Sequence, residues 1–169
     1  IMPFFRGSEK YEDMYYKYTY CSYYIKDYIN AENLFKTFVE NFPNSTHIEE
    51  CDYMHSYSFY KQSPKVELDQ TATSKTISLM QAFINTHPQS ERNKEATEII
   101  DLCRRKLEEK EYKSAELYYN LGYYKSAAVA FASLIENFPD SEKSDEYKLI
   151  IIKSYYKYAG QSVIDKQME

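Results

Sequence analysis

The sequence predicts an all-α fold in which helix pairs stack into an α-solenoid. One stretch occurs three times: an apolar segment at helical spacing runs into a Pro and then a Ser, with copies that end at Ser45, Ser90 and Ser141. Self-similarity of this kind is the signature of a repeat protein. Composition agrees, because 3 Gly and 5 Pro among 169 residues are typical of helices that are interrupted only at their ends.

The pattern predicts about seven helices, one of them long and central. Ser8 is a suitable N-cap for the first helix, Pro43 prevents continuation of the second, and Gly122 ends the long one in a left-handed conformation. Lys26 and Asp27 form a tight turn between the first two helices. The predicted ranges are 8–25, 28–41, 47–60, 71–86, 91–121, 124–138 and 142 to at least 160.

The spacing of the three prolines indicates the kind of repeat. Pro43 and Pro88 are 45 residues apart, and Pro88 and Pro139 are 51 apart. A tetratricopeptide repeat (TPR) is a helix-turn-helix of about 34 residues. The excess falls where the pattern shows an insertion, the first in a loop over 61–70 and the second in the doubled helix over 91–121.

In this frame the second helix of each pair carries a small residue, an aromatic or Met, a large apolar residue and the closing Pro. The sets are Ala31, Phe35, Phe38 and Pro43; Thr76, Met80, Phe83 and Pro88; and Ala127, Phe131, Leu134 and Pro139. We therefore expect one TPR-like array over 1–169, with repeats at about 8–45, 46–90 and 91–141 and a final helix over 142–169.

Charge and cysteine content narrow the class of protein. The net charge is -5 and the sequence pI is about 5.4, which argues against a nucleic-acid partner. We interpret Cys21, Cys51 and Cys103 as buried thiols, because they fall among apolar helical neighbours. The sequence shows neither a run of apolar residues long enough to span a membrane nor a signal peptide. The isoleucine at position 1 suggests an excised fragment.

The candidate binding site is a groove lined by the first helix of each pair. The chain has 20 Tyr, whose large rigid rings with a polar tip suit either a peptide channel or simple packing of the groove, and both interpretations stay open. The candidate groove residues are Tyr16, Tyr20, Tyr23, Met54, Tyr57, Tyr112 and Tyr119. Of these, Tyr16, Tyr20 and Tyr57 are the hypothesised client contacts.

No catalytic, metal or cofactor site is predicted, and we expect the protein not to be an enzyme. His47 and His55 are eight residues apart, too far for one ion without a third ligand between them. His87 occupies the repeat position of Phe42 and Phe138, so we interpret it as a packing residue at a helix end. The sequence has no Gly-rich phosphate loop and no Cys–His pair at a recognisable spacing.

Three passages stand out beside the repeat frame: the Ser63-Pro64 segment that ends in Leu68-Asp69-Gln70-Thr71, then Ala115-Glu116-Leu117-Tyr118-Tyr119-Asn120-Leu121-Gly122, and Gln161-Ser162-Val163-Ile164-Asp165-Lys166-Gln167-Met168-Glu169. With these passages the chain resembles the BamD family, the outer-membrane lipoproteins of the β-barrel assembly machinery, in the form typical of Bacteroidota-like bacteria. The resemblance covers nearly the whole chain from Ser8, and relative to the family we expect truncation at both ends.

The resemblance implies a non-enzymatic scaffold at the periplasmic face of the outer membrane, tethered by an N-terminal lipid that this fragment does not contain. It implies two kinds of partner, the POTRA domains of a BamA-like barrel protein and unfolded outer-membrane proteins. The alternative is a generic TPR peptide-binding adaptor in a cell-envelope complex. The loop over 61–70 and the long helix favour the first, because ordinary adaptors lack both insertions.

Overall fold

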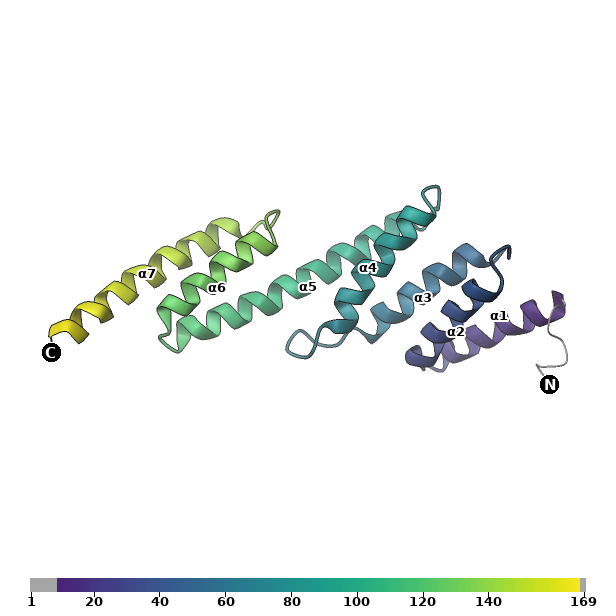
Figure 1. Ribbon diagram of the computed structural model, residues 1–169, viewed down its shortest axis with the longest axis horizontal. Helices are drawn as coiled ribbons and strands as arrows, with labels where there is room; N and C mark the ends of the chain where they lie inside the picture. Colours follow the sequence, from purple (N-terminus) through teal and green to yellow (C-terminus); the bar gives the residue numbers. More distant parts are fainter. Residues whose placement is uncertain (1–8, 168–169) are drawn as a thin grey trace. The chain divides into compact units, whose positions relative to one another are not determined.

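The computed structural model describes the backbone of residues 9–167 and the side chains of residues 10–162, and this part of the chain contains seven α-helices and no strand (Figure 1). The helices are α1 (Glu9–Tyr24), α2 (Tyr28–Asn41), α3 (Ile48–Gln62), α4 (Thr71–Thr86), α5 (Asn93–Asn120), α6 (Tyr124–Asn137) and α7 (Ser144–Gln167). The all-α prediction and the long central helix are confirmed, since α5 has 28 residues. The predicted cap Ser8 and the last two residues of the third family passage lie outside the described residues.

Helix ends follow local chemistry to within a few residues of the prediction. The largest internal differences are of two residues: α5 and α7 each begin two residues later than predicted, and α3 continues two residues beyond Tyr60. It stops at Ser63, whose ψ of 115° is extended. A residue that precedes proline is pushed out of the helical region, so Pro64 sets this boundary.

The chain divides into two compact units, residues 1–104 and 105–169, with the boundary inside α5. The first unit holds α1 to α4 and the start of α5, and the second holds the rest of α5 with α6 and α7. Each unit has its own core. In the first, aromatic residues of α1 and α2 pack with Cys51, Tyr53 and Phe83, and in the second Ala115, Phe131, Leu134 and Tyr147 pack together.

The repeat positions predicted on the second helices are the most buried part of each core. All are at most 1% exposed: Ala31, Phe35, Phe38, Thr76, Met80, Phe83, Ala127, Phe131 and Leu134. Thr76 stands where the other two copies have Ala, and its hydroxyl donates to the carbonyl of Ala72 in its own helix at 2.8 Å. Because this hydroxyl makes its hydrogen bond within its own helix, Thr can take the place of Ala where two helices pack closely.

The three turns between helix pairs share one hydrogen-bond pattern. In each turn the Ser Oγ accepts from the backbone N–H two residues further on, and it donates to a glutamate in the first helix of the preceding pair. The Ser–Glu pairs are Ser45–Glu12 at 2.5 Å, Ser90–Glu49 at 2.6 Å and Ser141–Glu108 at 2.5 Å. The N–H donors are His47, Arg92 and Lys143. This double role explains why serine recurs at the end of all three sequence copies.

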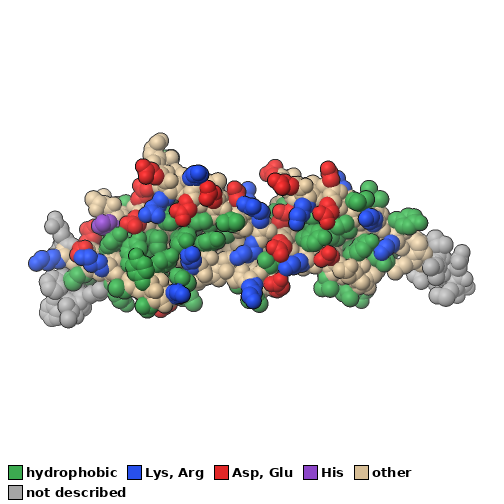
Figure 2. Space-filling view, turned by 180° about the vertical axis from the view of Figure 1, so that it is seen from behind, with side chains coloured by type: hydrophobic (Ala, Val, Ile, Leu, Met, Phe, Trp, Pro, Cys, Tyr) green, Lys and Arg blue, Asp and Glu red, His purple; other side chains and the backbone are tan. Residues whose placement is uncertain are grey.

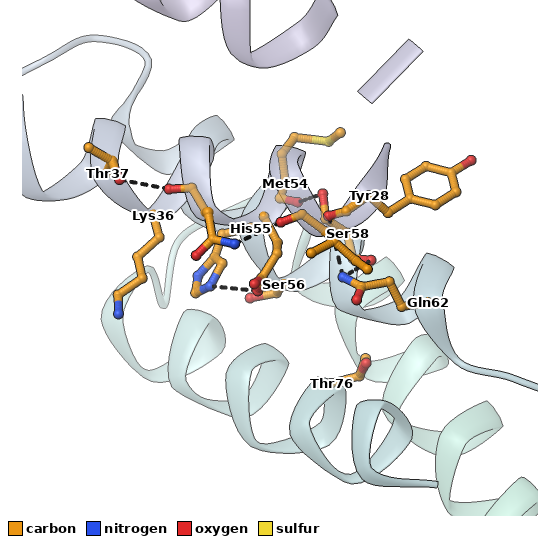
Figure 3. Close-up of polar contacts among 12 residues, drawn as sticks. Tyr28, Lys36, Thr37, Met54, His55, Ser56, Ser58, Gln62 and Thr76 are labelled. Carbon is orange, nitrogen blue, oxygen red and sulfur yellow. Dashed lines mark hydrogen bonds and ion pairs between the residues drawn. The ribbon is translucent and has the colours of Figure 1, made fainter. Parts of the chain in front are cut away.

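The α3 helix is also joined to α2 at its other end (Figure 3). Gln62 Nε2 donates to the backbone carbonyl of Tyr28 at 3.3 Å and to that of Ser58 at 3.2 Å. Ser58 in turn donates to the Met54 carbonyl at 2.7 Å. The C-terminus of α3 therefore lies beside the N-terminus of α2, at the edge opposite the Ser45 turn.

The turns within the first and third pairs also share a conformation. Lys26 and Gly122 both have positive φ, 64° and 82°. In each case the next residue donates to a carbonyl five positions back, Asp27 to Ser22 and Tyr123 to Tyr118, which satisfies a carbonyl at the helix end. The left-handed Gly122 is confirmed, and Lys26 adopts the same conformation without being glycine.

The three cysteines differ in their exposure to solvent. Cys51 and Cys103 are buried, as predicted, but Cys21 is exposed, so the prediction of three buried thiols is wrong for that residue. Cys21 instead lines an open hollow together with other residues of α1 and Glu50. Among the described residues, no helix has the length and hydrophobicity required to cross a bilayer.

Substitutions at the two left-handed residues, Gly122 and Lys26, should change the stability of the protein in opposite directions. In Gly122→Ala the added Cβ has no neighbouring atom within 4 Å, so the substitution is disfavoured only by the left-handed backbone conformation. We expect it to lower the free energy of unfolding by about 1 kcal/mol. Lys26→Gly relieves the same strain and should gain roughly 0.5 kcal/mol. Urea unfolding followed by circular dichroism measures both, and a Gly122→Ala variant as stable as the parent would contradict the explanation.

Candidate tyrosine–glutamate site

The first unit contains a carboxylate that receives two tyrosine hydroxyls. Tyr16 and Tyr20 lie four residues apart on α1 and so share a face of that helix. Their hydroxyls donate to Oε2 and Oε1 of Glu50, each at 2.7 Å. Glu50 lies in the first turn of α3, where the helix dipole favours a negative charge. This site therefore ties α1 to α3 across the boundary between two pairs.

His47 and Arg92 also take part in this site. The His47 ring stacks on Tyr16 with centroids 4.1 Å apart. Arg92 approaches Glu50 Oε1 at 3.5 Å, and its guanidinium also lies 4.8 Å above the Tyr53 ring. Because Arg92 precedes α5, residues from three successive helix pairs meet at one carboxylate.

The hydrogen bonds control the charge state of the site. Burial opposes ionisation of Glu50, but the hydroxyls of Tyr20 and Tyr16 and the nearby Arg92 outweigh it and lower the pKa of this carboxyl. Burial and the Glu50 carboxylate raise the pKa of Tyr16 to about 12 and raise that of Tyr20 as well. At neutral pH the site therefore holds an ionised glutamate and two neutral phenols that donate to it.

An open hollow of about 390 Å³ lies beside this arrangement. Its lining residues come from α1 and the start of α3: Tyr16, Lys17, Tyr20, Cys21, Tyr24 and Glu50. The lining is mainly apolar and aromatic, and Lys17, held by Asp13 at 2.7 Å, adds a charge at the rim. A hollow that is open to solvent and lined by rings suits a side chain of an extended peptide better than an enclosed small molecule.

The other candidates of the first unit lie next to this site or beneath it. Tyr23 and Tyr57 are half-buried with ring centroids 6.3 Å apart, and Lys61 Nζ lies 4.8 Å above the Tyr57 ring. Met54 is 7% exposed and packs in the core. Figure 2 shows the side opposite to that of Figure 1, with the first unit in the left half of the picture. Hydrophobic side chains cover a broad area of the first unit on this side.

The two remaining candidates belong to the second unit and form a separate group. Tyr112 contacts the rings of Phe131 and Tyr147, and Tyr119 contacts the ring of Tyr124 at 5.5 Å. Here Glu108 receives two hydroxyls, from Ser141 and, at 2.6 Å, from Tyr147. Tyr112 and Tyr119 therefore take part in packing around their own pair of helices.

Several residues of the hollow were not among the candidates. Tyr24 follows Tyr20 by four residues, so helical spacing alone could have found it. Lys17 and Cys21 extend the same face by the same rule. No sequence signal indicates Arg92, because its link to Glu50 joins residues 42 positions apart.

The histidines are engaged with neighbouring carboxylates or rings. His87 Nε2 lies 3.1 Å from Asp52 Oδ2, and its ring lies 5.0 Å from that of Phe83. His55 Nε2 lies 3.9 Å from Glu32, and burial lowers the pKa of this imidazole. Within the described part of the chain, no three His, Cys, Asp or Glu residues come together as a metal site would require.

The family model described as YfiO, outer membrane lipoprotein, matches residues 2–169. The chain belongs to this family. It is also 31% identical over 131 residues to a protein of Aquifex aeolicus (strain VF5) described as a putative outer membrane protein assembly factor BamD. That alignment covers 76% of the chain and 43% of the relative, so the chain spans less than half the length of this curated family member.

Because the pKa of Glu50 is lowered in the folded protein, its contribution to stability should depend on pH. A carboxyl whose pKa falls on folding stabilises the protein above its ordinary pKa of 4.5, and this contribution is lost as the pH falls through the lowered value. Because the Glu50 side chain is 33% exposed, we expect Glu50→Gln to cost only about 1–2 kcal/mol at neutral pH, with the difference shrinking under acid conditions.

Urea unfolding at a series of pH values measures this difference. Glu98→Gln, which changes an exposed carboxylate on α5, is the matched control and should follow the parent protein. If Glu50→Gln also followed the parent at every pH, the two tyrosine hydrogen bonds would not stabilise the fold.

Proposed function

We propose that this chain acts as a non-enzymatic scaffold in the assembly of outer-membrane β-barrel proteins, at the periplasmic face of the outer membrane. The observation that carries the proposal is the family match over residues 2–169, together with a relative described as a BamD assembly factor. In this role the repeats dock the POTRA domains of a BamA-like protein and bind unfolded outer-membrane proteins. A lipid on the full-length protein would supply the tether that the family description implies.

The geometry of the first unit supports the client-binding part of the proposal. Unfolded clients expose extended backbone and aromatic side chains, and the hollow beside Glu50 offers Tyr20 and Tyr24 as flat apolar surfaces. The hydrogen bonds to Glu50 hold the rings of Tyr16 and Tyr20 in place before a client arrives. Fixed side chains lose little conformational entropy on binding, which favours affinity for a flexible partner.

A titration against the soluble POTRA region of the BamA-like protein from the same organism tests the docking part. We expect saturable binding with a Kd on the order of 1 µM or tighter, typical of a specific interface. If neither this chain nor the full-length protein bound, the scaffold proposal would fail and the generic adaptor would become the better explanation.

Alanine variants in the hollow test the client-binding part. We expect Tyr20→Ala and Tyr24→Ala each to weaken binding of a labelled, extended, aromatic-rich peptide about tenfold, as the loss of an interface aromatic commonly does. Fluorescence anisotropy gives the Kd. Tyr18→Ala is the matched control, since Tyr18 is an exposed tyrosine of the same helix that does not line the hollow.

Tyr20→Phe separates two roles of the same side chain. It keeps the ring and removes the hydroxyl that donates to Glu50, so a weaker affinity for Tyr20→Phe would assign part of the effect to positioning. Unchanged affinity in both alanine variants would exclude the hollow as a client site while leaving POTRA docking untouched.

A further inference from the structure

All three histidines of the chain lie in the first unit, and one of them is nearly buried among charged side chains. His47, His55 and His87 precede the end of this unit at residue 104, and residues 105–169 contain no histidine. The side chain of His55, in the middle of α3, is only 13% exposed. Because imidazole is the side chain that ordinarily changes its charge between pH 5 and 8, mild acid acts first on this unit.

The carboxylate of Glu32, on α2, lies close to His55 without forming a hydrogen bond to it. His55 Nε2 is 3.9 Å from Glu32 Oε2, and the Glu32 side chain is only 15% exposed. A separation of 3.9 Å is too long for a hydrogen bond. The His55 ring packs instead against Phe59, edge to face, with centroids 5.7 Å apart. The fold therefore offers a proton on this ring no direct acceptor.

Two lysines oppose a positive charge on His55. Lys36 of α2 lies beside the imidazole ring (Figure 3) and is 3.8 Å from Glu40, so that carboxylate is shared with a lysine. Lys75 of α4 also repels a protonated His55. Positive charges thus face this ring from both helices that pack against α3.

The remaining acid near His55 is also engaged elsewhere. Asp52 precedes His55 by three residues and shares its face of α3, but Asp52 Oδ2 is 3.1 Å from Nε2 of His87. Burial lowers the pKa of His55, and the attraction of Asp52 does not reverse this. Burial also raises the pKa of Glu32. At neutral pH the His55 ring is therefore uncharged.

We propose that His55 makes the first unit acid-sensitive, because protonation of its ring loosens the packing of α3 against α2 and α4. A charged ring at this place would lack both water and a hydrogen-bonded carboxylate, so the folded state loses free energy relative to an opened one. The second unit has no equivalent group. Because α3 also supplies Glu50 to the hollow, the response acts on the unit that contains the candidate client site, although it does not depend on that role.

The pKa values of His55 and Glu32 define the pH range of the response. A base whose pKa falls on folding destabilises the folded state once the pH drops below its ordinary value, which is 6.5 for His55. Glu32 acts in the opposite direction, since its pKa is raised from 4.5 and its neutralisation relieves the folded state at lower pH. We therefore expect the loss of stability to begin below pH 6.5 and to diminish once Glu32 takes up a proton.

Hydrogen–deuterium exchange of the whole chain, followed by mass spectrometry, tests the proposal unit by unit. Between about pH 7 and pH 5.5 we expect amides of α2 and α3 to exchange faster, after correction for the intrinsic effect of pH. The limit is roughly eightfold, reached if a histidine of ordinary pKa 6.5 stays neutral in the folded state. Amides of α6, in the second unit, should show no such increase.

Three variants assign the response to His55. His55→Gln replaces the ring with a neutral polar side chain and should abolish the increase, whereas His47→Gln, at the start of α3, is the matched control and should keep it. Glu32→Gln removes a negative charge beside His55, so the increase should persist and the titration of the His55 ring protons, measured by NMR, should move to lower pH.

Four results would overturn the proposal. They are an unchanged exchange rate of α2 and α3 in acid, an equal increase in α6, a His55→Gln variant that responds like the parent, and an NMR titration of His55 in the parent at or above pH 6.5. The NMR titration of the parent and the Glu32→Gln variant decide the matter even if His55→Gln fails to fold.

Discussion

The hydrogen bond between the turn serine and a glutamate of the preceding pair sets the spacing on which the rest of each unit depends. A helix pair cannot bury both of its faces alone, so it needs a defined position relative to the next pair. Ser45, Ser90 and Ser141 supply that position, because each one starts a helix through its Oγ and reaches back to Glu12, Glu49 or Glu108. The buried aromatic residues of the second helices then fill the remaining space.

The tyrosine–glutamate site depends on the same spacing. Glu50 follows Ser45 by five residues, so fixing the start of α3 also fixes this carboxylate beneath Tyr16 and Tyr20. The second unit has the same framework but places Tyr147 where the first has Cys51, and Tyr147 donates to Glu108 rather than opening a surface site. One repeat frame thus supports a solvent-facing aromatic surface in one unit and a packed aromatic core in the other.

The two kinds of turn carry different chemistry because they have different tasks. The inter-pair turns contain the residues that hold neighbouring pairs together, and their tips are polar. The intra-pair turns need only a left-handed residue, Lys26 or Gly122, so their flanking positions are free to carry Ile25 or Leu121. The inter-pair turns are therefore constrained by contacts between neighbouring pairs, whereas the intra-pair turns are constrained mainly by the backbone conformation of one residue.

The sequence by itself determined the helix pattern, the repeat frame and the core. Ala31, Phe35 and Phe38 recur at fixed spacing with a closing Pro, and local periodicity and capping chemistry depend only on neighbours along the chain. The tertiary structure alone decided that Arg92 meets Glu50, that Met54 is buried and that Cys21 is exposed. Those outcomes depend on which side of a helix faces another pair 30 to 42 residues away, and periodicity cannot distinguish two nearly equivalent apolar faces.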